Sequence, residues 1–240
     1  VWSTGYNNSG QLGIGNTDVQ VLPQKMTVVS GIKEIAAGTN HLVLLTEGGY
    51  VLSLGYNYCS KLGDGSSTDR TTAVDVKTVS NKYVTDAKHI AAGEHSVFIS
   101  RKKDSEGNPH GMYVIGRNDY GQLGNNTTRT SNYAVQVLDS KGTGYLNNIK
   151  DVSVGSAYVT ALAKDGTVWS WGYGTSGQMG NGAKTTQKLP VQAKNVTDVQ
   201  KIIAGYYTTT ALKTDGTVWA WGYNGYGQLA NGTTTSSATA

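Results

Sequence analysis

The chain has 240 residues, enough to bury a large hydrophobic core, and its single cysteine, Cys59, excludes an internal disulfide framework. Its formal net charge of +4 comes from 20 Lys and Arg against 16 Asp and Glu, spread along the sequence. We expect no nucleic-acid partner, because such a partner requires a dense basic face, and no membrane span, because no apolar run approaches about eighteen residues.

Two sequence patterns alternate along the chain. The first, written VWSWGYGTSGQMGNG in its fourth copy, lies at residues 1–15, 51–65, 113–126, 168–182 and 218–232. The second, written IKEIAAGTNHLVLL in its first copy, lies at residues 32–45, 87–100, 149–162 and 199–212. A period of about fifty residues predicts a repeat architecture. We therefore divide a single repeat domain, 1–240, into a half unit at 1–31 and units at 32–86, 87–148, 149–198 and 199–240.

Each unit is predicted to consist of short β-strands. Val168 and Ser170 alternate with Trp169 and Trp171, and β-branched and aromatic residues of this kind suit a pleated, buried surface. The Asp165-Gly166 pair supplies the backbone angles of a tight hairpin turn. Short strands repeated at this period are typical of β-propeller blades. The predicted fold is all-β, a β-propeller of four-stranded blades of about fifty residues each.

One unit departs from this turn pattern. The segment RKKDSEGNPHG, Arg101–Gly111, replaces the short Asp-Gly turn of the later units. Long hairpin insertions are tolerated at little cost in stability, and they also occur at partner contacts. Both interpretations stay open, with a solvated loop as the favoured one.

The two patterns together, VWxWGxNxxGQLGxG and IxxIAAGxxHxxAL, resemble the regulator of chromosome condensation repeat over essentially the whole chain. The match departs at Cys59-Ser60-Lys61 and at Arg117, which replaces an aromatic residue. The resemblance implies a propeller that serves as a binding platform, since relatives include a guanine-nucleotide exchange factor and a β-lactamase inhibitor. Neither activity can be carried over residue by residue. The Thr-, Asn- and Tyr-rich last copies are most similar to bacterial, often surface-exposed, members.

The repeat count is smaller than the resemblance implies. Members of the family form seven-bladed propellers, which would need roughly 380 residues at this period. We therefore expect a partial or open propeller of four blades plus a half, either a piece of a larger protein or an arc completed by blades from another chain. A closed ring of four or five blades is the alternative.

No residue pattern indicates catalysis, a cofactor or a metal. The histidines lack HxH and HExxH spacing, Cys59 has no neighbouring base in the sequence, and no GxSxG segment is present. The glycine-rich segments recur without a following helix, so we expect tight returns rather than a phosphate site. Their glutamines are expected to bond backbone groups, and the residues after them to pack between blades: Gln11, Gln122, Gln178 and Gln228, then Leu12, Leu123, Met179 and Leu229.

The turns that vary between units are the better candidates for binding. Turns after the AAG and VWxWG segments are predicted to emerge on one face, and tyrosine, of which the chain has 15, is a residue that recognition surfaces use. Filling of blade edges by tyrosine is an equally favoured explanation. The candidate partner-binding face comprises Tyr6, Asn7, Asn40, Tyr56, Tyr58, Glu94, His95, Arg117, Asp119, Tyr120, Tyr158, Tyr173, Tyr206, Tyr207, Tyr223 and Tyr226.

The sequence therefore favours a non-catalytic protein-interaction or scaffold module within a larger secreted or cell-surface protein. Its expected partner is another protein or the remaining blades of the same protein. A glycan-binding, adhesin-like module is the alternative, but such a binder should repeat one aromatic and polar trio at each turn, and these turns differ. An enzyme on the propeller face is less favoured, since few ionisable residues converge there. The extracellular assignment rests on resemblance alone, with the cytosol as the alternative.

Overall fold

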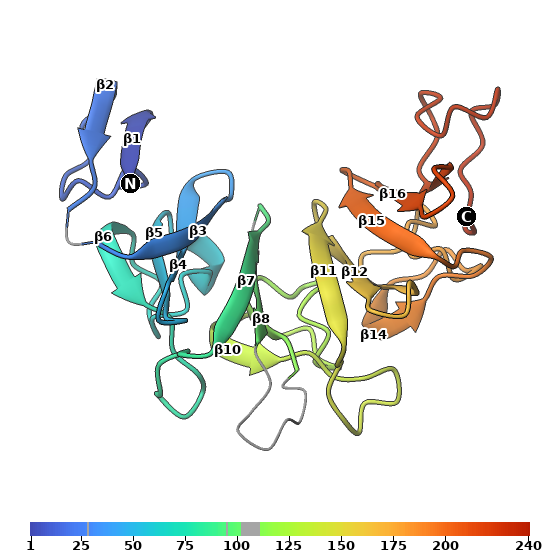
Figure 1. Ribbon diagram of the computed structural model, residues 1–240, viewed down its shortest axis with the longest axis horizontal. Coiled ribbons are helices and arrows are strands. Elements are labelled where there is room, and N and C mark those ends of the chain that lie inside the picture. The colour runs from blue at the N-terminus through green and yellow to red at the C-terminus, as the bar shows by residue number, and fades with distance from the viewer. Residues whose placement is uncertain (28, 95, 102–110) are drawn as a thin grey trace. The chain divides into compact units, whose positions relative to one another are not determined.

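The computed structural model describes residues 1–27, 29–94, 96–101 and 111–240, and it shows an all-β chain (Figure 1). Residue contacts divide the chain into two compact units. Unit 1 comprises Val1–Arg117 and Thr130–Val135, and unit 2 comprises Asn118–Arg129 and Gln136–Ala240. His95, and the insertion apart from its two end residues, lie outside the described residues.

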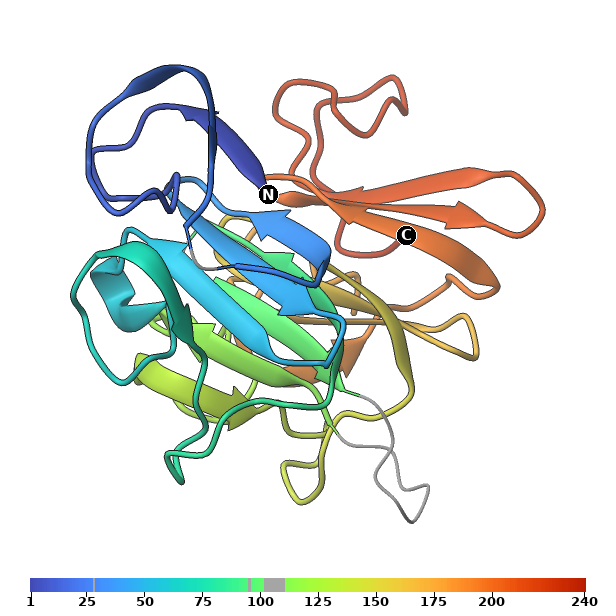
Figure 2. The ribbon, with the colours of Figure 1, turned by 60° about the vertical axis from the view of Figure 1, so that its left-hand side comes forward.

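Unit 1 contains three antiparallel sheets, and each strand in them pairs with the next strand in the sequence. A two-stranded sheet holds β1 (Trp2–Gly5) and β2 (Gln20–Lys25). The second sheet holds β3 (Ile32–Ala37), β4 (His41–Thr46), β5 (Val51–Gly55) and β6 (Arg70–Asp75), which lie edge to edge in Figure 2. The third holds β7 (Ala87–Ala92), β8 (Ser96–Arg101), β9 (Tyr113–Gly116) and β10 (Ser131–Gln136). A single 3₁₀ turn, η1 (Tyr58–Ser60), follows β5.

Unit 2 contains two more sheets of the same topology. The first holds β11 (Ile149–Val154), β12 (Tyr158–Ala163), β13 (Val168–Gly172) and β14 (Gln187–Gln192). The second holds β15 (Val199–Ala204), β16 (Thr208–Lys213) and β17 (Val218–Gly222). An isolated bridge joins Gly222 to Ser237 beyond β17. The predicted all-β fold of four-stranded antiparallel blades is confirmed, and β3, β7, β11 and β15 begin at the first residue of the four predicted units.

The sheets bend at the same places in every repeat. The register between β11 and β12 shifts between Ile149 and Asp151. The register between the first two strands shifts at the matching position in the sheets that begin with β3, β7 and β15. A second shift lies at the glycine that ends the third strand, for example Gly172, whose φ is +100°. A Cβ on Gly172 would lie 2.6 Å from the Ala157 carbonyl oxygen, so the close approach of this turn requires glycine.

The hydrophobic core forms where neighbouring sheets face each other within a unit. In unit 1, Val43 and Leu45 of β4 belong to the same buried cluster as Ile90 and Val97 of the next sheet. In unit 2, Leu162 and Val168 cluster with residues of β15 to β17. Burial of such side chains stabilises a fold by about 25 cal/mol per Å² of apolar surface. Repeat-to-repeat packing of this kind leaves the turns at the strand ends to carry variable residues.

Candidate functional site

A buried asparagine shapes the long return loop after the third strand of a repeat. Asn118 has no exposed surface, and its Oδ1 accepts a hydrogen bond from the Leu123 amide at 2.9 Å. Its Nδ2 donates to the carbonyl oxygens of Thr127 and Arg129, each at 3.1 Å. The matching residues Asn7, Asn57 and Asn224 make the same three bonds.

The recurring glutamine closes the tip of the same loop. Gln122 Oε1 accepts a hydrogen bond from the Tyr120 amide at 2.9 Å, and Gln178 Oε1 accepts one from the Ser176 amide at 3.0 Å. The residue after each glutamine is fully buried, as Leu123 and Met179 are. The predicted roles of these residues are confirmed at these positions. The loop is therefore fixed from inside, while residues such as Tyr120 are free to vary.

The asparagine network corrects the prediction for Asn7, which was placed on the exposed binding face. Asn7 is fully buried, because its side chain holds the return loop together through Leu12, Asn16 and Asp18. In the fourth copy of the first pattern Gly174 takes this place, and a Cβ there would lie 2.1 Å from the Thr185 carbonyl oxygen. That loop therefore follows a path that does not accommodate an asparagine.

Tyr158 is the second predicted face residue that is buried. Its ring lies over Gly155, and its hydroxyl donates a hydrogen bond to the Thr208 carbonyl oxygen of the next sheet. Thr209 Oγ1 donates to the same hydroxyl at 3.2 Å. Burial raises the pKa of the Tyr158 hydroxyl. Tyr158 joins two sheets of unit 2 rather than facing a partner, because glycine at position 155 leaves room for its ring.

Lys61 lies in the segment where the second copy departs from the repeat, and its burial was not predicted from the sequence. It replaces the recurring glutamine, only 1% of it is exposed, and its Nζ donates to the Glu94 carbonyl oxygen at 3.2 Å. The Nζ atom also lies 4.8 Å from the centre of the Tyr56 ring. Burial lowers the pKa of Lys61, although negative groups nearby, including Glu94, oppose this effect. A lysine in the place of a recurring glutamine was the signal that could have identified this position.

Four tyrosines from three successive repeats form a connected cluster in unit 2, here called the tyrosine cluster: Tyr120, Tyr173, Tyr206 and Tyr207. The rings of Tyr120 and Tyr173 meet at a centroid distance of 5.0 Å and an angle of 67°. Tyr173 contacts Tyr207 at 5.4 Å, and Tyr207 contacts Tyr206 at 4.6 Å. Tyr206 is 67% exposed and Tyr120 is 38% exposed. Edge-to-face contacts of this kind stabilise aromatic pairs by about 0.5–1.5 kcal/mol each.

The cluster gathers residues that are far apart in sequence because two kinds of turn meet at one end of each sheet. The Tyr173 amide donates to the Ala157 carbonyl oxygen at 2.9 Å, which joins the turn after β13 to the turn between β11 and β12. The Tyr223 amide donates to the Tyr207 carbonyl oxygen at the same distance. The prediction that both turns emerge together is confirmed within unit 2.

The other predicted face residues have varied environments. Tyr226 is 88% exposed, and its ring contacts Tyr223 at 6.0 Å. In unit 1, Tyr6 and Tyr58 are exposed, and Tyr58 stacks on Tyr56. The half-buried members are Asn40, Tyr56, Glu94, Arg117 and Tyr223, and Asp119 is exposed. The structure brings only Tyr120, Tyr173, Tyr206 and Tyr207 together into a four-residue cluster among the described residues.

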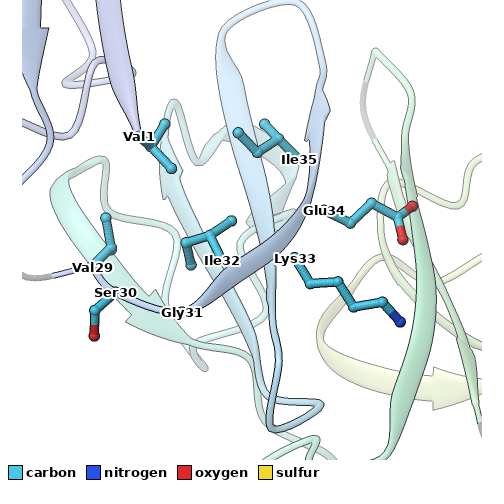
Figure 3. A pocket seen from close by; sticks show the side chains of 8 residues that line it. All are labelled: Val1, Val29, Ser30, Gly31, Ile32, Lys33, Glu34 and Ile35. Atoms are coloured by element: carbon cyan, nitrogen blue, oxygen red, sulfur yellow. The ribbon is translucent and has the colours of Figure 1, made fainter.

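Unit 1 also holds a cavity of 420 Å³ beside β3 (Figure 3). Val1, Val29 and Ile32 give it an apolar lining, and in Figure 3 the charged ends of Lys33 and Glu34 point away from Val1. The Glu34 carboxylate instead accepts a hydrogen bond from the Ile90 amide at 3.2 Å. The cavity therefore has a mixed lining, with apolar side chains beside the polar residues Ser30, Lys33 and Glu34.

Two sequence expectations, on metal ligands and on membrane-spanning helices, bear on the described parts of the chain. Across residues 1–27, 29–94, 96–101 and 111–240, no cluster of three or more His, Cys, Asp or Glu side chains could hold a metal ion. Within the same ranges, no helix is long and apolar enough to cross a bilayer.

Comparison with known proteins decides the family. The model of the RCC1-like domain matches residues 1–240. The chain belongs to the RCC1-like domain family. The ultraviolet-B receptor UVR8 of Arabidopsis thaliana is 31% identical over 206 residues, which cover 85% of this chain and 43% of the receptor. The human probable E3 ubiquitin-protein ligase HERC4 is 36% identical over 200 residues, covering 81% of this chain and 18% of the ligase.

Solved structures support the same fold. The crystal structure of human WBSCR16 superposes with a TM-score of 0.79 at 21% identity, covering 99% of this chain and 61% of the other. Prp20p from Saccharomyces cerevisiae gives a TM-score of 0.74 at 19% identity, with 98% and 54% covered. The chain thus spans less than two thirds of each of these relatives. These relatives are plant, human and yeast proteins, and the expected likeness to bacterial surface members stays a prediction.

Proposed function

We propose that this RCC1-like chain is a non-catalytic interaction module that binds a protein partner through the tyrosine cluster. The observation that carries the proposal is the contact series Tyr120–Tyr173–Tyr207–Tyr206, which presents two well-exposed rings from separate repeats. Tyrosine is enriched in the energetically dominant parts of protein interfaces, because its ring buries apolar area while its hydroxyl keeps a hydrogen bond.

Structural relatives offer supporting precedent. Prp20p was solved in a study of its binding to Gsp1p and histones, and the yeast RCC1 protein was solved bound to Kap60. Their low identity to this chain, 19% and 20%, carries the fold alone, so no partner is transferred. What this chain shares with them is the fold.

A glycan-binding module is the second candidate, favoured by the exposed ring of Tyr226 beside Tyr223. The turns of successive repeats differ at the cluster positions, since Tyr120 corresponds to Ser176 and Tyr173 corresponds to Arg117. A repeated sugar site would require the same trio at each turn. The protein-binding function is therefore the better supported of the two.

The test compares partner capture by three purified chains on the source cells' extract: the natural chain, a Tyr173→Ala/Tyr206→Ala variant and a Tyr83→Ala control. Tyr83 is 54% exposed and lies in unit 1, away from the cluster residues in sequence. We expect a partner that the natural chain and the control retain and the double variant loses. Equal capture by all three chains would argue against the proposal. So would a double variant that keeps its protein partner but loses binding to a glycan array that the natural chain binds.

Further repeats of the same protein are the second proposed partner. Ile35 of β3 is 51% exposed, whereas Ile90 at the matching position of β7 is 7% exposed, since β7 packs against β3 and β4. We infer that a further blade covers Ile35 and fills the cavity beside it. Sedimentation and thermal unfolding of this chain test the idea. A monomer with one sharp transition, whose stability is unchanged when further repeats are added, would contradict it.

The proposed setting is a larger protein that is secreted or displayed at a cell surface. The proposal rests on the Thr-, Asn- and Tyr-rich sequence of the last repeats, which resembles the sequences of surface-exposed members of the family. Protease treatment of intact cells, followed by detection of the chain with an antibody, tests this setting. Complete protection in intact cells together with digestion after lysis would place the chain in the cytosol.

A further inference from the structure

The tyrosine cluster lies among turns that contain almost no charge. The turns of unit 2 at this end of the sheets are residues 118–122, 155–157, 173–178, 205–207 and 223–228. Asp119, an exposed acidic residue, is the one charged side chain in these five turns. Arg117, which matches Tyr173 in the repeat, directly precedes the first of these turns and belongs to unit 1.

Unit 1 shows how the repeat treats a tyrosine at the same position. Tyr56 follows Gly55 as Tyr173 follows Gly172, and both tyrosines begin the loop after the third strand. In unit 1 the Lys61 ammonium lies 4.8 Å from the centre of the Tyr56 ring. In unit 2 the residue corresponding to Lys61 is Gln178, a neutral amide. The ring of Tyr56 therefore has a cation from its own loop, and the ring of Tyr173 has none from its own loop.

The hydroxyl groups of the cluster lie close enough to influence one another. Burial, together with the phenols of Tyr206, Tyr173 and Tyr120, raises the pKa of Tyr207. The ring contacts bring the oxygen lone pairs of these tyrosines and the negative faces of their rings into one place. Such an arrangement attracts a cation and repels an anion.

We propose that the tyrosine cluster accommodates the cationic end of a Lys or Arg side chain that a protein partner presents. This inference rests on the proposed function, and it specifies the chemistry that the partner must carry. The ring faces provide cation–π attraction, and the phenol oxygens accept hydrogen bonds from the ammonium or guanidinium group. The pairing of Lys61 with Tyr56 is the intramolecular counterpart of this contact.

The experiment titrates the full 240-residue chain with short acetylated and amidated peptides that differ at one central residue. The central residue is Arg, Lys, citrulline or Glu, and citrulline keeps the shape of Arg without its charge. Tyrosine ring resonances, assigned with single Tyr→Phe variants, report binding. We expect the Arg and Lys peptides to shift the Tyr173 and Tyr207 resonances and to bind at least about threefold more tightly than the citrulline peptide.

Matched variants separate the cluster from other exposed tyrosines. Tyr173→Ala and Tyr207→Ala should reduce Arg-peptide binding to the level of the citrulline peptide. Tyr226→Ala should leave it unchanged, since Tyr226 is 88% exposed in the same unit and its ring contact is with Tyr223. The variants' circular dichroism spectra should match that of the natural chain, and Tyr173→Phe, which keeps the ring, should retain most of the binding.

The outcomes distinguish this inference from the function on which it rests. Equal binding of the Arg and citrulline peptides, preferred binding of the Glu peptide, absence of shifts with every peptide, or an equal loss in Tyr226→Ala would each overturn the cation site. If the Tyr173→Ala/Tyr206→Ala variant still loses its protein partner in that case, the interaction function stands without a cation. If charge-selective peptide binding is found but partner capture survives in the variant, the cation site stands and the proposed function fails.

Discussion

The indole of Trp171 is expected to contribute strongly to the stability of unit 2. Its Nε1 donates a hydrogen bond to the Gln122 carbonyl oxygen at 2.9 Å, and neither partner is more than 3% exposed. Trp171→Phe would leave that buried oxygen without its donor, which costs about 1–3 kcal/mol. The smaller ring would also leave a partial cavity worth about another 1–2 kcal/mol. We therefore expect a loss of about 2–5 kcal/mol in the free energy of unfolding.

Trp169 provides the matched control on the same strand. It is half-buried, and its Nε1 donates to Thr167 Oγ1 at 3.1 Å, a local bond that water can replace. Trp169→Phe should cost less than about 1 kcal/mol. Urea unfolding followed by far-ultraviolet circular dichroism measures both values. Equal losses in the two variants, or a loss below about 1 kcal/mol for Trp171→Phe, would refute the reasoning that the indole joins successive repeats.

Three further predictions concern buried polar groups. Because burial lowers the folded-state pKa of Lys61, the unfolded chain binds the proton more tightly, and the natural chain should gain stability relative to Lys61→Gln as pH rises towards about 10; parallel urea-midpoint curves would contradict this. Tyr158→Phe should cost about 1–3 kcal/mol at neutral pH in urea unfolding, since the Thr208 carbonyl oxygen loses its donor. Because the folded pKa of Tyr158 is raised, its contribution should fall above about pH 10, and a difference that grows there would be inconsistent with it. Asn118→Ala removes three hydrogen bonds of a fully buried side chain and should cost about 2–4 kcal/mol while exposing residues 118–129 to limited proteolysis, whereas Thr128→Ala, at an exposed position of the same loop, should leave the loop protected.

The repeat period and the residue alternation were enough to predict the all-β blades, because both depend on local sequence. The glycine after the third strand marked the turn in each copy, and Gly172 indeed has a positive φ. Which side chains are buried at those turns could not be predicted in the same way. Asn7 and Tyr158 looked like polar loop residues, but each is buried by a partner that sequence does not reveal: the carbonyl groups of a loop up to 11 residues away for Asn7, and the next sheet for Tyr158.

The tyrosine cluster could be predicted only in part, because its residues lie within 87 positions of one another but come from three repeats. The sequence placed Tyr120, Tyr173, Tyr206 and Tyr207 among sixteen candidates without indicating which would touch. Contact depends on the stacking of neighbouring sheets in unit 2. This stacking brings the loop that follows the third strand of one repeat against the turn between the first two strands of the next repeat. Lys61 was missed for the same reason, since its partner Glu94 lies 33 residues further along the chain.

The buried network explains how this repeat can change its binding chemistry without losing its fold. Asn118 and Gln122 fix the loop through main-chain atoms, so the identity of Tyr120 between them has no part in those bonds. The matching residue is Ser9, Cys59, Ser176 or Tyr226 in the other copies. Lys61 marks the limit of this freedom, because in the copy where lysine replaces the glutamine the tip residue Cys59 has left-handed backbone, with φ of +64°, and the tip residues of the other copies do not. New specificity should therefore arise by substitution at the tip positions, and changes at the asparagine or glutamine should alter the loop as a whole.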